Sequence, residues 1–194
     1  LRKPPNAIAY PKFARTSKEL DAAIWKNITA KAHHYGISQT TVILCIYGYV
    51  LSYWSNQSKL CINLTLFNRL PLHQQIDNVI GVFTDLELFN YVDDASKQGK
   101  SLLTLFKDVH NKLWDDIDHN LFDGLEFQRL VRSELPEFAN AEVIAPVVLT
   151  SMFDMTYDTR KILDGSYLRM GYSITQTPQV WLDHKAYEKN GNLV

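Results

Sequence analysis

Residues 60–67 read Leu-Cys-Ile-Asn-Leu-Thr-Leu-Phe, and this stretch decides the fold class. Every second residue from Leu60 to Leu66 is large and apolar, which is the period of a β-strand with one buried face. The turn-rich segment Asn68-Arg69-Leu70-Pro71 follows directly and ends the pattern. The sequence therefore predicts a strand here, in a chain whose neighbouring segments have the period of helices.

Helical patterns lie on both sides of this strand. Upstream, apolar residues recur at helical spacing over residues 18–35, where Ser17 can cap the first turn, and a second helix is predicted over residues 39–53. The second helix is apolar nearly all round, so we expect it to be buried. Downstream, a long amphipathic helix is predicted over residues 97–118 and a shorter one over residues 124–132.

Four more segments have the character of strands. They span residues 83–92, 143–149, 167–174 and 179–183, and the second of them is a β-branched run. Helices and strands interleave along the whole chain, and no internal repeat or linker interrupts it. The predicted class is therefore α/β (α+β), with a mixed β-sheet packed with helices in a single unit over residues 1–194.

Composition excludes several kinds of partner. The 194 residues are 46% hydrophobic and carry a net charge of −1, so a buried core is expected and no basic stripe is available for nucleic acid. The longest apolar run, residues 42–51, is shorter than the ~20 residues that a membrane-spanning helix needs. Cys45 and Cys61 lie in apolar runs and are predicted to be buried free thiols, in keeping with a cytoplasmic protein. No Cys/His spacing typical of a metal site and no glycine-rich phosphate loop is present.

Two stretches concentrate polar side chains where an ordinary sheet would carry Val and Ile. Residues 145–151 form an apolar strand that ends in Thr150 and Ser151, and residues 175–183 combine amides, hydroxyls, an indole and the carboxylate of Asp183. Polar residues at a strand end that opens onto a cleft are well placed to meet a ligand. His184 follows Asp183 on the predicted strand, so it is expected to point to the opposite face.

Five segments, in one order, are similar to motifs of the heterocyclization domains of nonribosomal peptide synthetases. They are residues 64–73, 80–86, 113–126, 146–151 and 176–183, which resemble the family segments LTLFNRLPLH, GDFTSL, LW-DLDH--FSGVE, PVVFTS and SQTPQVWLD. Val82 stands where the family usually has aspartate, and Asp85 stands where it usually has serine. These two departures alter the electrostatics of the local loop.

The resemblance implies a chloramphenicol acetyltransferase-like lobe, the C-terminal one of two lobes that form a V. The aspartate-containing motif of the N-terminal lobe has no counterpart in this chain. The chain also starts without Met and stops after Asn190-Gly191-Asn192, a turn that we expect to have no second strand behind it. We therefore expect a segment of a longer polypeptide that has no heterocyclase activity by itself.

The same resemblance implies the chemistry and the partners. Such a domain joins a carrier-bound acyl group to carrier-bound Cys, Ser or Thr and then cyclodehydrates the amide to a thiazoline or oxazoline. The implied partners are peptidyl or aryl carrier proteins, the N-terminal lobe of the same domain and the adjacent adenylation domain. No cofactor is expected to bind directly, because the substrates ride on the phosphopantetheine of the carrier proteins.

The site residues also follow from the resemblance. Asp183 is implied as the general acid and base, with Thr150 as its hydrogen-bonding partner. Gln176 and Ser151 are implied as substrate-binding residues, and Asn68 as a residue that binds substrate or anchors its loop. Two other titratable features are expected to be structural. They are His119 behind three aspartates and the D-x4-D pair Asp118 and Asp123, in which Glu126 replaces the serine expected of the family's paired-aspartate motif.

Two alternatives stay open at this point. One is the lobe of an ordinary condensation domain, which forms the amide without cyclising it. The other is a non-catalytic lobe that serves only as a docking platform for carrier proteins. The segments at residues 66–71 and 176–183 argue against the first alternative, and intact Thr150 and Asp183 argue against the second.

Overall fold

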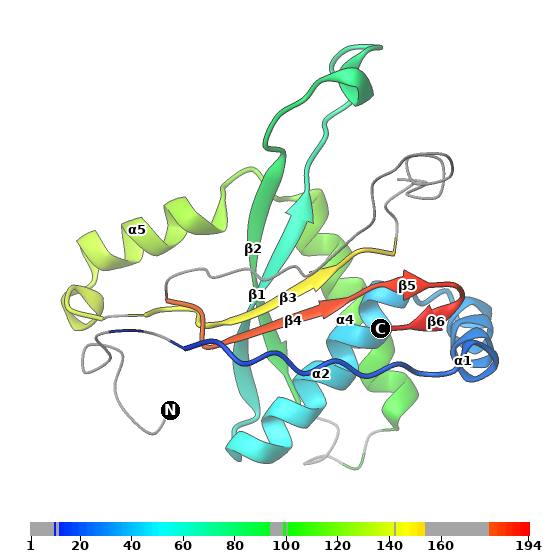
Figure 1. Cartoon of the computed structure of the whole chain (residues 1–194). Coiled ribbons are helices and arrows are strands. Elements are labelled where there is room, and N and C mark those ends of the chain that lie inside the picture. Colours follow the sequence, from blue (N-terminus) through cyan, green and yellow to red (C-terminus); the bar gives the residue numbers. More distant parts are fainter. Residues whose placement is uncertain (1–9, 11, 94–98, 100, 142, 154–178) are drawn as a thin grey trace.

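A four-stranded mixed sheet organises the chain (Figure 1). The computed structural model describes residues 10, 12–93, 99, 101–141, 143–153 and 179–194. The strands are β1 (Lys59–Phe67), β2 (Thr84–Val92), β3 (Val147–Ser151) and β4 (Leu182–Ala186), in the order β2-β1-β3-β4. β1 is antiparallel to β2, and β3 is parallel to both β1 and β4. The predicted mixed sheet is thereby confirmed.

The predicted strands differ in how well their bounds were placed. Those at residues 60–67 and 83–92 are confirmed to within one residue. The strand predicted from residue 143 begins at Val147, and the one predicted over residues 179–183 is displaced to Leu182–Ala186. Gln179 has a positive φ of 69°, so its backbone is not extended. The strand predicted over residues 167–174 lies outside the described residues.

Four α-helices accompany the sheet in the described part of the chain: α1 (Ala22–His34), α2 (Gln39–Ser55), α4 (Leu102–Asp118) and α5 (Gly124–Glu134). Short 3-10 turns occur at η2 (Ile76–Asn78) and η3 (Pro136–Phe138). The predicted start of the first helix was wrong. Asp21 caps α1 by accepting a hydrogen bond from the Ala23 N–H at 2.8 Å, while Leu20 pairs as an isolated bridge with Leu193. None of the helices in the described ranges is long and apolar enough to cross a bilayer.

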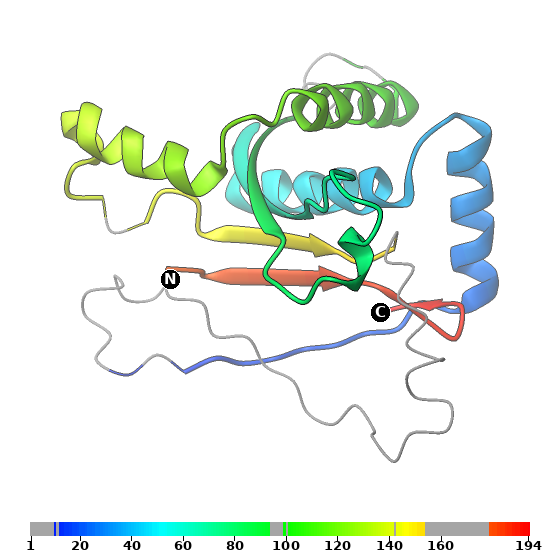
Figure 2. The same cartoon turned by 90° about the horizontal axis from the view of Figure 1, so that it is seen from above.

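The two faces of the sheet are covered differently. Helices α2 and α4 lie on one side of β1 and β2, and α5 lies on the other side (Figures 1 and 2). On the α2/α4 side, Ile62, Leu64, Phe89 and Tyr91 are almost fully buried and belong to the main hydrophobic core. This is the alternation that residues 60–67 predicted.

The second helix was expected to be buried all round, and this expectation was wrong. Val42, Leu44 and Cys45 of α2 are buried, but Tyr53 and Trp54 at its end are 76% and 82% exposed. Cys45 is buried as predicted, whereas Cys61 is exposed, because it lies on the strand face opposite to Ile62. Both thiols are free.

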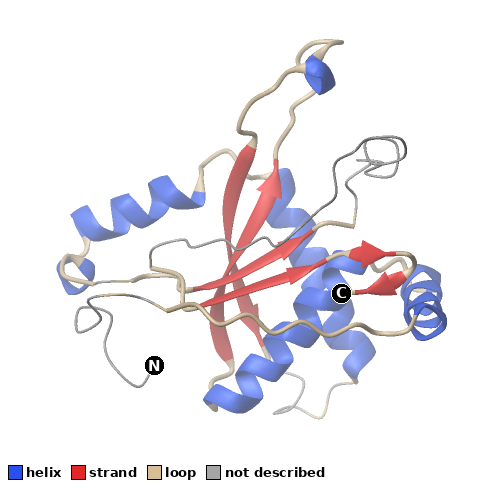
Figure 3. Cartoon of the chain, in the orientation of Figure 1, coloured by secondary structure: helices blue, strands red, loops and turns tan. Residues whose placement is uncertain are grey.

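The C-terminal turn does have a second strand behind it. β5 (Glu188–Lys189) and β6 (Asn192–Leu193) form a short antiparallel hairpin, visible in Figure 3. Asn190 and Gly191 both have positive φ, 52° and 83°, as a two-residue hairpin turn with Asn-Gly requires. The prediction of an unpaired turn was therefore wrong.

The connection between β1 and β2, residues 68–83, forms an arm that extends beyond the sheet (Figure 1). Arg69 ties its two sides together. Its Nη1 donates hydrogen bonds to the carbonyls of Ile76 and Val79, at 2.5 and 3.1 Å, and its guanidinium lies 3.9 Å from the centre of the Phe83 ring.

Candidate functional site

The strand register brings the predicted catalytic residues to one face of the sheet. Thr150 of β3 pairs with Thr65 of β1 on one side and with Lys185 of β4 on the other. Asp183 pairs with Val148, two residues before Thr150. Residues paired across strands and residues two apart along a strand share a face. Thr65, Thr150, Asp183 and Lys185 therefore share one face, which we call the polar face.

The polar face is the one turned away from α2 and α4. Leu149, which alternates with Thr150, is 1% exposed and lies in the core with the helices. Over β2, helix α5 covers the polar face. Gly124, the first residue of α5, packs against the backbone of Leu86 and the side chain of Leu88. The polar side chains therefore occupy the β1, β3 and β4 part of the face.

The hydroxyl of Thr150 has a defined partner. It donates a hydrogen bond to Thr65 Oγ1 at 3.0 Å, and both groups are partly buried. We expected Thr150 to pair with Asp183, and the register places these two side chains one row apart on the same face. Thr65 is a residue that the sequence analysis did not single out.

Asp183 lies beside a cation on the same strand. Lys185 Nζ is 3.8 Å from Asp183 Oδ2, and their side chains are 36% and 28% exposed. At this exposure solvent screens the pair, so it adds at most about 1 kcal/mol to stability. The polar face thus presents a carboxylate, an ammonium group and two hydroxyls within two neighbouring rows of residues.

His184 points to the opposite face from Asp183, as the sequence predicted. Its ring stacks on Tyr47 of α2, with ring centres 4.7 Å apart. Burial against this ring lowers the pKa of His184, and the nearby charge of Asp183 acts in the opposite direction. Burial, with a smaller contribution from the charge of Asp183, raises the pKa of Tyr47 above its ordinary value.

Two of the predicted substrate-binding residues, Ser151 and Asn68, do not lie on the polar face. Ser151 Oγ lies 2.7 Å from Thr40 Oγ1 of α2, on the helix-covered side, because alternation turns Ser151 away from Thr150. Asn68 lies at the base of the arm, where its backbone N–H donates to the Phe83 carbonyl at 2.8 Å. Gln176 lies outside the described residues.

Asp85, one of the two departures from the family motifs, joins two connections. Its Oδ2 accepts hydrogen bonds from Asn68 Nδ2 at 3.3 Å and from Asn120 Nδ2 at 3.2 Å. Asn68 belongs to the arm and Asn120 to the link between α4 and α5. Asp85 and Asn68 are therefore anchoring residues in this structure.

The features expected to be structural have local partners. His119 is the residue that caps the C-terminal end of α4, and its Nδ1 lies 2.8 Å from the Asp115 carbonyl oxygen. This contact and the Asp115 charge raise the pKa of His119. Asp123 caps α5 by accepting from the Leu125 N–H at 3.1 Å. Asp118 is the last residue of α4, so the D-x4-D pair spans a helix end and a helix start.

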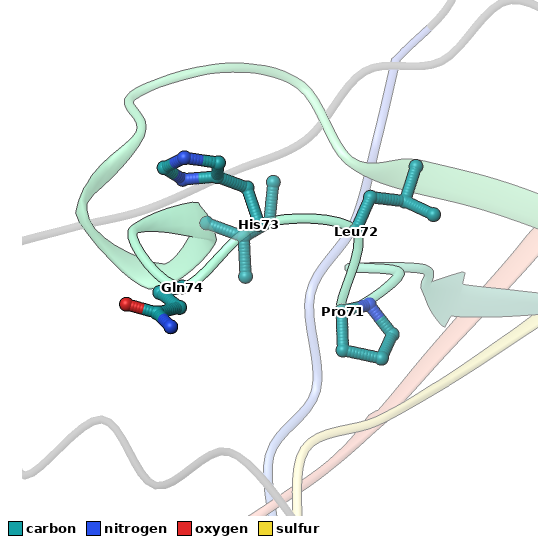
Figure 4. Close-up of a pocket in the computed structure, with 5 residues that line it drawn as sticks. Pro71, Leu72, His73 and Gln74 are labelled. Carbon is teal, nitrogen blue, oxygen red and sulfur yellow. The ribbon is translucent and has the colours of Figure 1, made fainter.

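A surface hollow occurs at the tip of the arm, lined by Pro71, Leu72, His73, Gln74 and Ile76 (Figure 4). His73 Nδ1 accepts a hydrogen bond from the Gln75 N–H at 3.1 Å, so its ring fixes the turn. The arm carries this hollow beyond the sheet, away from β3 and β4 (Figure 1). In the described ranges, no cluster of three or more His, Cys, Asp or Glu could hold a metal ion.

The chain is similar in sequence to parts of two large synthetases. No protein-family model matches the chain. Pyochelin synthetase PchF of Pseudomonas aeruginosa is 34% identical over 183 residues, which are 94% of this chain and 10% of that protein. Bacitracin synthase 1 of Bacillus licheniformis is 32% identical over 197 residues, covering all of this chain and 4% of that protein.

A solved relative has the same fold. The cyclization-docking bidomain of the nonribosomal peptide synthetase EpoB from Sorangium cellulosum superposes with a TM-score of 0.82 at 28% identity. The match covers 99% of this chain and 38% of the EpoB chain. The chain thus spans a small part of the synthetases that it matches. Over nearly its whole length it is a homologue of part of the nonribosomal peptide synthetases, and its fold is that of part of a cyclization domain.

Proposed function

We propose that this chain provides the C-terminal wall of a heterocyclization site, in which a carrier-bound acyl-Cys, -Ser or -Thr amide is cyclodehydrated to a thiazoline or oxazoline. One observation carries the proposal: the register places Thr150 and Asp183 on the same face of the sheet, away from the core helices. The solved relative that matches nearly the whole chain is named a cyclization bidomain, which supports the same reading.

The reaction needs proton transfers at three atoms. The side-chain thiol or hydroxyl of the substrate loses its proton as it adds to the amide carbonyl carbon, and the carbonyl oxygen takes up a proton to give a tetrahedral hemiaminal. The C–O bond then breaks, the oxygen leaves as water with a delivered proton, and loss of the N–H proton lets the C=N bond form. General acid and base help of this kind is typically worth about 10²–10⁴-fold.

Asp183 is the group on the polar face that can both deliver and remove a proton in this sequence. Lys185 Nζ lies 3.8 Å from its Oδ2. Thr150 provides a hydroxyl in the next row of the same face, where it can bind the oxygen or nitrogen of the intermediate. Amide formation, which precedes ring closure, does not require the Asp183 proton in this proposal.

The whole reaction requires more than this chain. The proposed partners are an N-terminal lobe that completes the cleft, carrier proteins whose phosphopantetheine arms bring both substrates, and an adenylation domain in the same synthetase. Solved relatives of this lobe occur in multidomain synthetases, which supports partners of this kind.

Product analysis distinguishes this proposal from an ordinary condensation lobe. In the complete domain, Asp183→Asn keeps the shape of the side chain and removes its titratable proton, so the amide should accumulate without the ring. Thr150→Val should slow ring closure more mildly, by roughly 10- to 150-fold, the equivalent of one hydrogen bond to a charged group. A domain whose wild-type form releases only the uncyclised amide would be a condensation domain.

A further inference from the structure

Strand β1 contributes polar side chains to the face that carries Thr150 and Asp183. Asn63 and Thr65 alternate with Ile62 and Leu64, which face the core helices. Asn63 is 7% exposed, and its Oδ1 has no hydrogen-bond partner among the residues that the structure describes. A face built only for packing would carry apolar residues at both positions. The β1 part of the polar face therefore has a role beyond packing.

Thr65 is the better placed of the two to act on the reaction. It lies directly opposite Thr150 in the parallel ladder. Its Oγ1 accepts a hydrogen bond from the Thr150 hydroxyl, and the two oxygens are 3.0 Å apart. A hydroxyl has one proton and two acceptor lone pairs. Because the Thr150 proton is directed toward β1, the lone pairs of Thr150 stay available to accept a hydrogen bond from another group.

We propose that Thr65 is a positioning residue for ring closure, holding the Thr150 hydroxyl so that it presents an acceptor to the intermediate or to protonated Asp183. This inference rests on the proposed function, because it has meaning only if Thr150 acts in cyclodehydration. Thr65 itself gains or loses no atom in the reaction. Without its oxygen, the Thr150 proton is free to rotate toward the Asp183 carboxylate, which competes with the transfer that Asp183 must make.

Three substitutions in the complete domain test the inference. Thr65→Val keeps the β-branched shape and removes the acceptor, and Thr65→Ser restores an acceptor. Thr84→Val is the matched control, because Thr84 lies on the same face but on the other neighbouring strand, paired with Phe67. Amide formation and ring closure are measured separately by single-turnover mass spectrometry, together with the melting temperature of each variant.

Thr65→Val should slow ring closure roughly 2- to 12-fold, the equivalent of one neutral hydrogen bond, and leave the rate of amide formation unchanged. Thr65→Ser should recover most of the lost rate, and Thr84→Val should have none of this effect. The double variant Thr65→Val, Thr150→Val should be no slower than Thr150→Val alone, since Thr65 acts through Thr150.

Two results would overturn the inference. One is wild-type ring closure in Thr65→Val; the other is an equal loss of both steps with a lower melting temperature, which would make Thr65 a packing residue. Asp183→Asn in the same assay separates this failure from a failure of the proposed function. If Asp183→Asn closes the ring at the normal rate, the function fails; if it stalls while Thr65→Val does not, only the role of Thr65 fails.

Discussion

Replacing Gly124 with alanine should loosen the contact between α5 and β2. A Cβ at this position would lie 2.6 Å from the Leu86 carbonyl oxygen and 3.1 Å from its carbon. Ordinary van der Waals contact needs 3.4–4 Å, and the clashing atoms belong to the backbone of a strand, so they cannot rotate away. The helix or the strand must move by most of 1 Å.

The expected cost follows from this clash. Overpacking a well-packed site costs about 1–3 kcal/mol, and an obstacle of backbone atoms favours the upper half of that range. The gain from alanine over glycine is small here, because Gly124 is the first residue of the helix. We therefore expect a net loss of about 2 kcal/mol in the free energy of unfolding, which lowers Tm.

Thermal unfolding of the complete domain, followed by circular dichroism, measures this change. Gly81→Ala is the matched control: Gly81 lies in the exposed arm with a negative φ, and its added Cβ would meet only the movable Phe83 ring at 3.3 Å. This control should change stability by less than about 0.5 kcal/mol. Equal melting temperatures for Gly124→Ala and the wild type would refute the close approach of α5 to β2.

Two further predictions concern pH and the isolated chain. Burial lowers the pKa of His184 below its value in the unfolded chain, so the contribution of the neutral ring to stability is complete above about pH 6.5 and is lost as the pH falls below it. His184→Phe, which keeps the stack on Tyr47, should therefore have a shallower fall of Tm between pH 7 and 5 than the wild type; an identical fall would contradict this. The isolated 194-residue chain should give neither amide nor heterocycle from carrier-loaded substrates, and turnover detected by mass spectrometry would disprove that expectation.

The sequence predicted the elements of the fold better than their ends. The alternation in residues 60–67 fixed which face of β1 is buried, because a period of two is a property of the strand alone. The start of α1 could not be read in the same way. Ser17 and Asp21 are both good capping residues, and the choice between them depends on the pairing of Leu20 with Leu193, a contact between the two ends of the chain.

That Thr150 and Asp183 share one face could be predicted if their strands are neighbours, but the partners of Thr150 could not. Their motifs are local, but the partner of Thr150 is set by the register of β3 on β1, which brings in a residue 85 positions away. The alternation of polar residues with Ile62 and Leu64 contained a signal for Thr65, since only one face of that strand needs apolar side chains. Ser151 follows Thr150 directly, and neighbouring residues of a strand point to opposite faces. Ser151 therefore meets Thr40 of α2 and not the polar face.

The rate of ring closure on a preformed substrate tests the central proposal most directly. A carrier protein loaded with the uncyclised acyl-Cys amide bypasses the condensation step, and the loss of one water is followed by mass spectrometry in single turnover. The complete domain with Asp183→Asn should close the ring at least ~10²-fold more slowly than the wild type while still binding the carrier. Ring closure at the wild-type rate by this variant would contradict the assignment of Asp183 as the acid and base of a heterocyclization site.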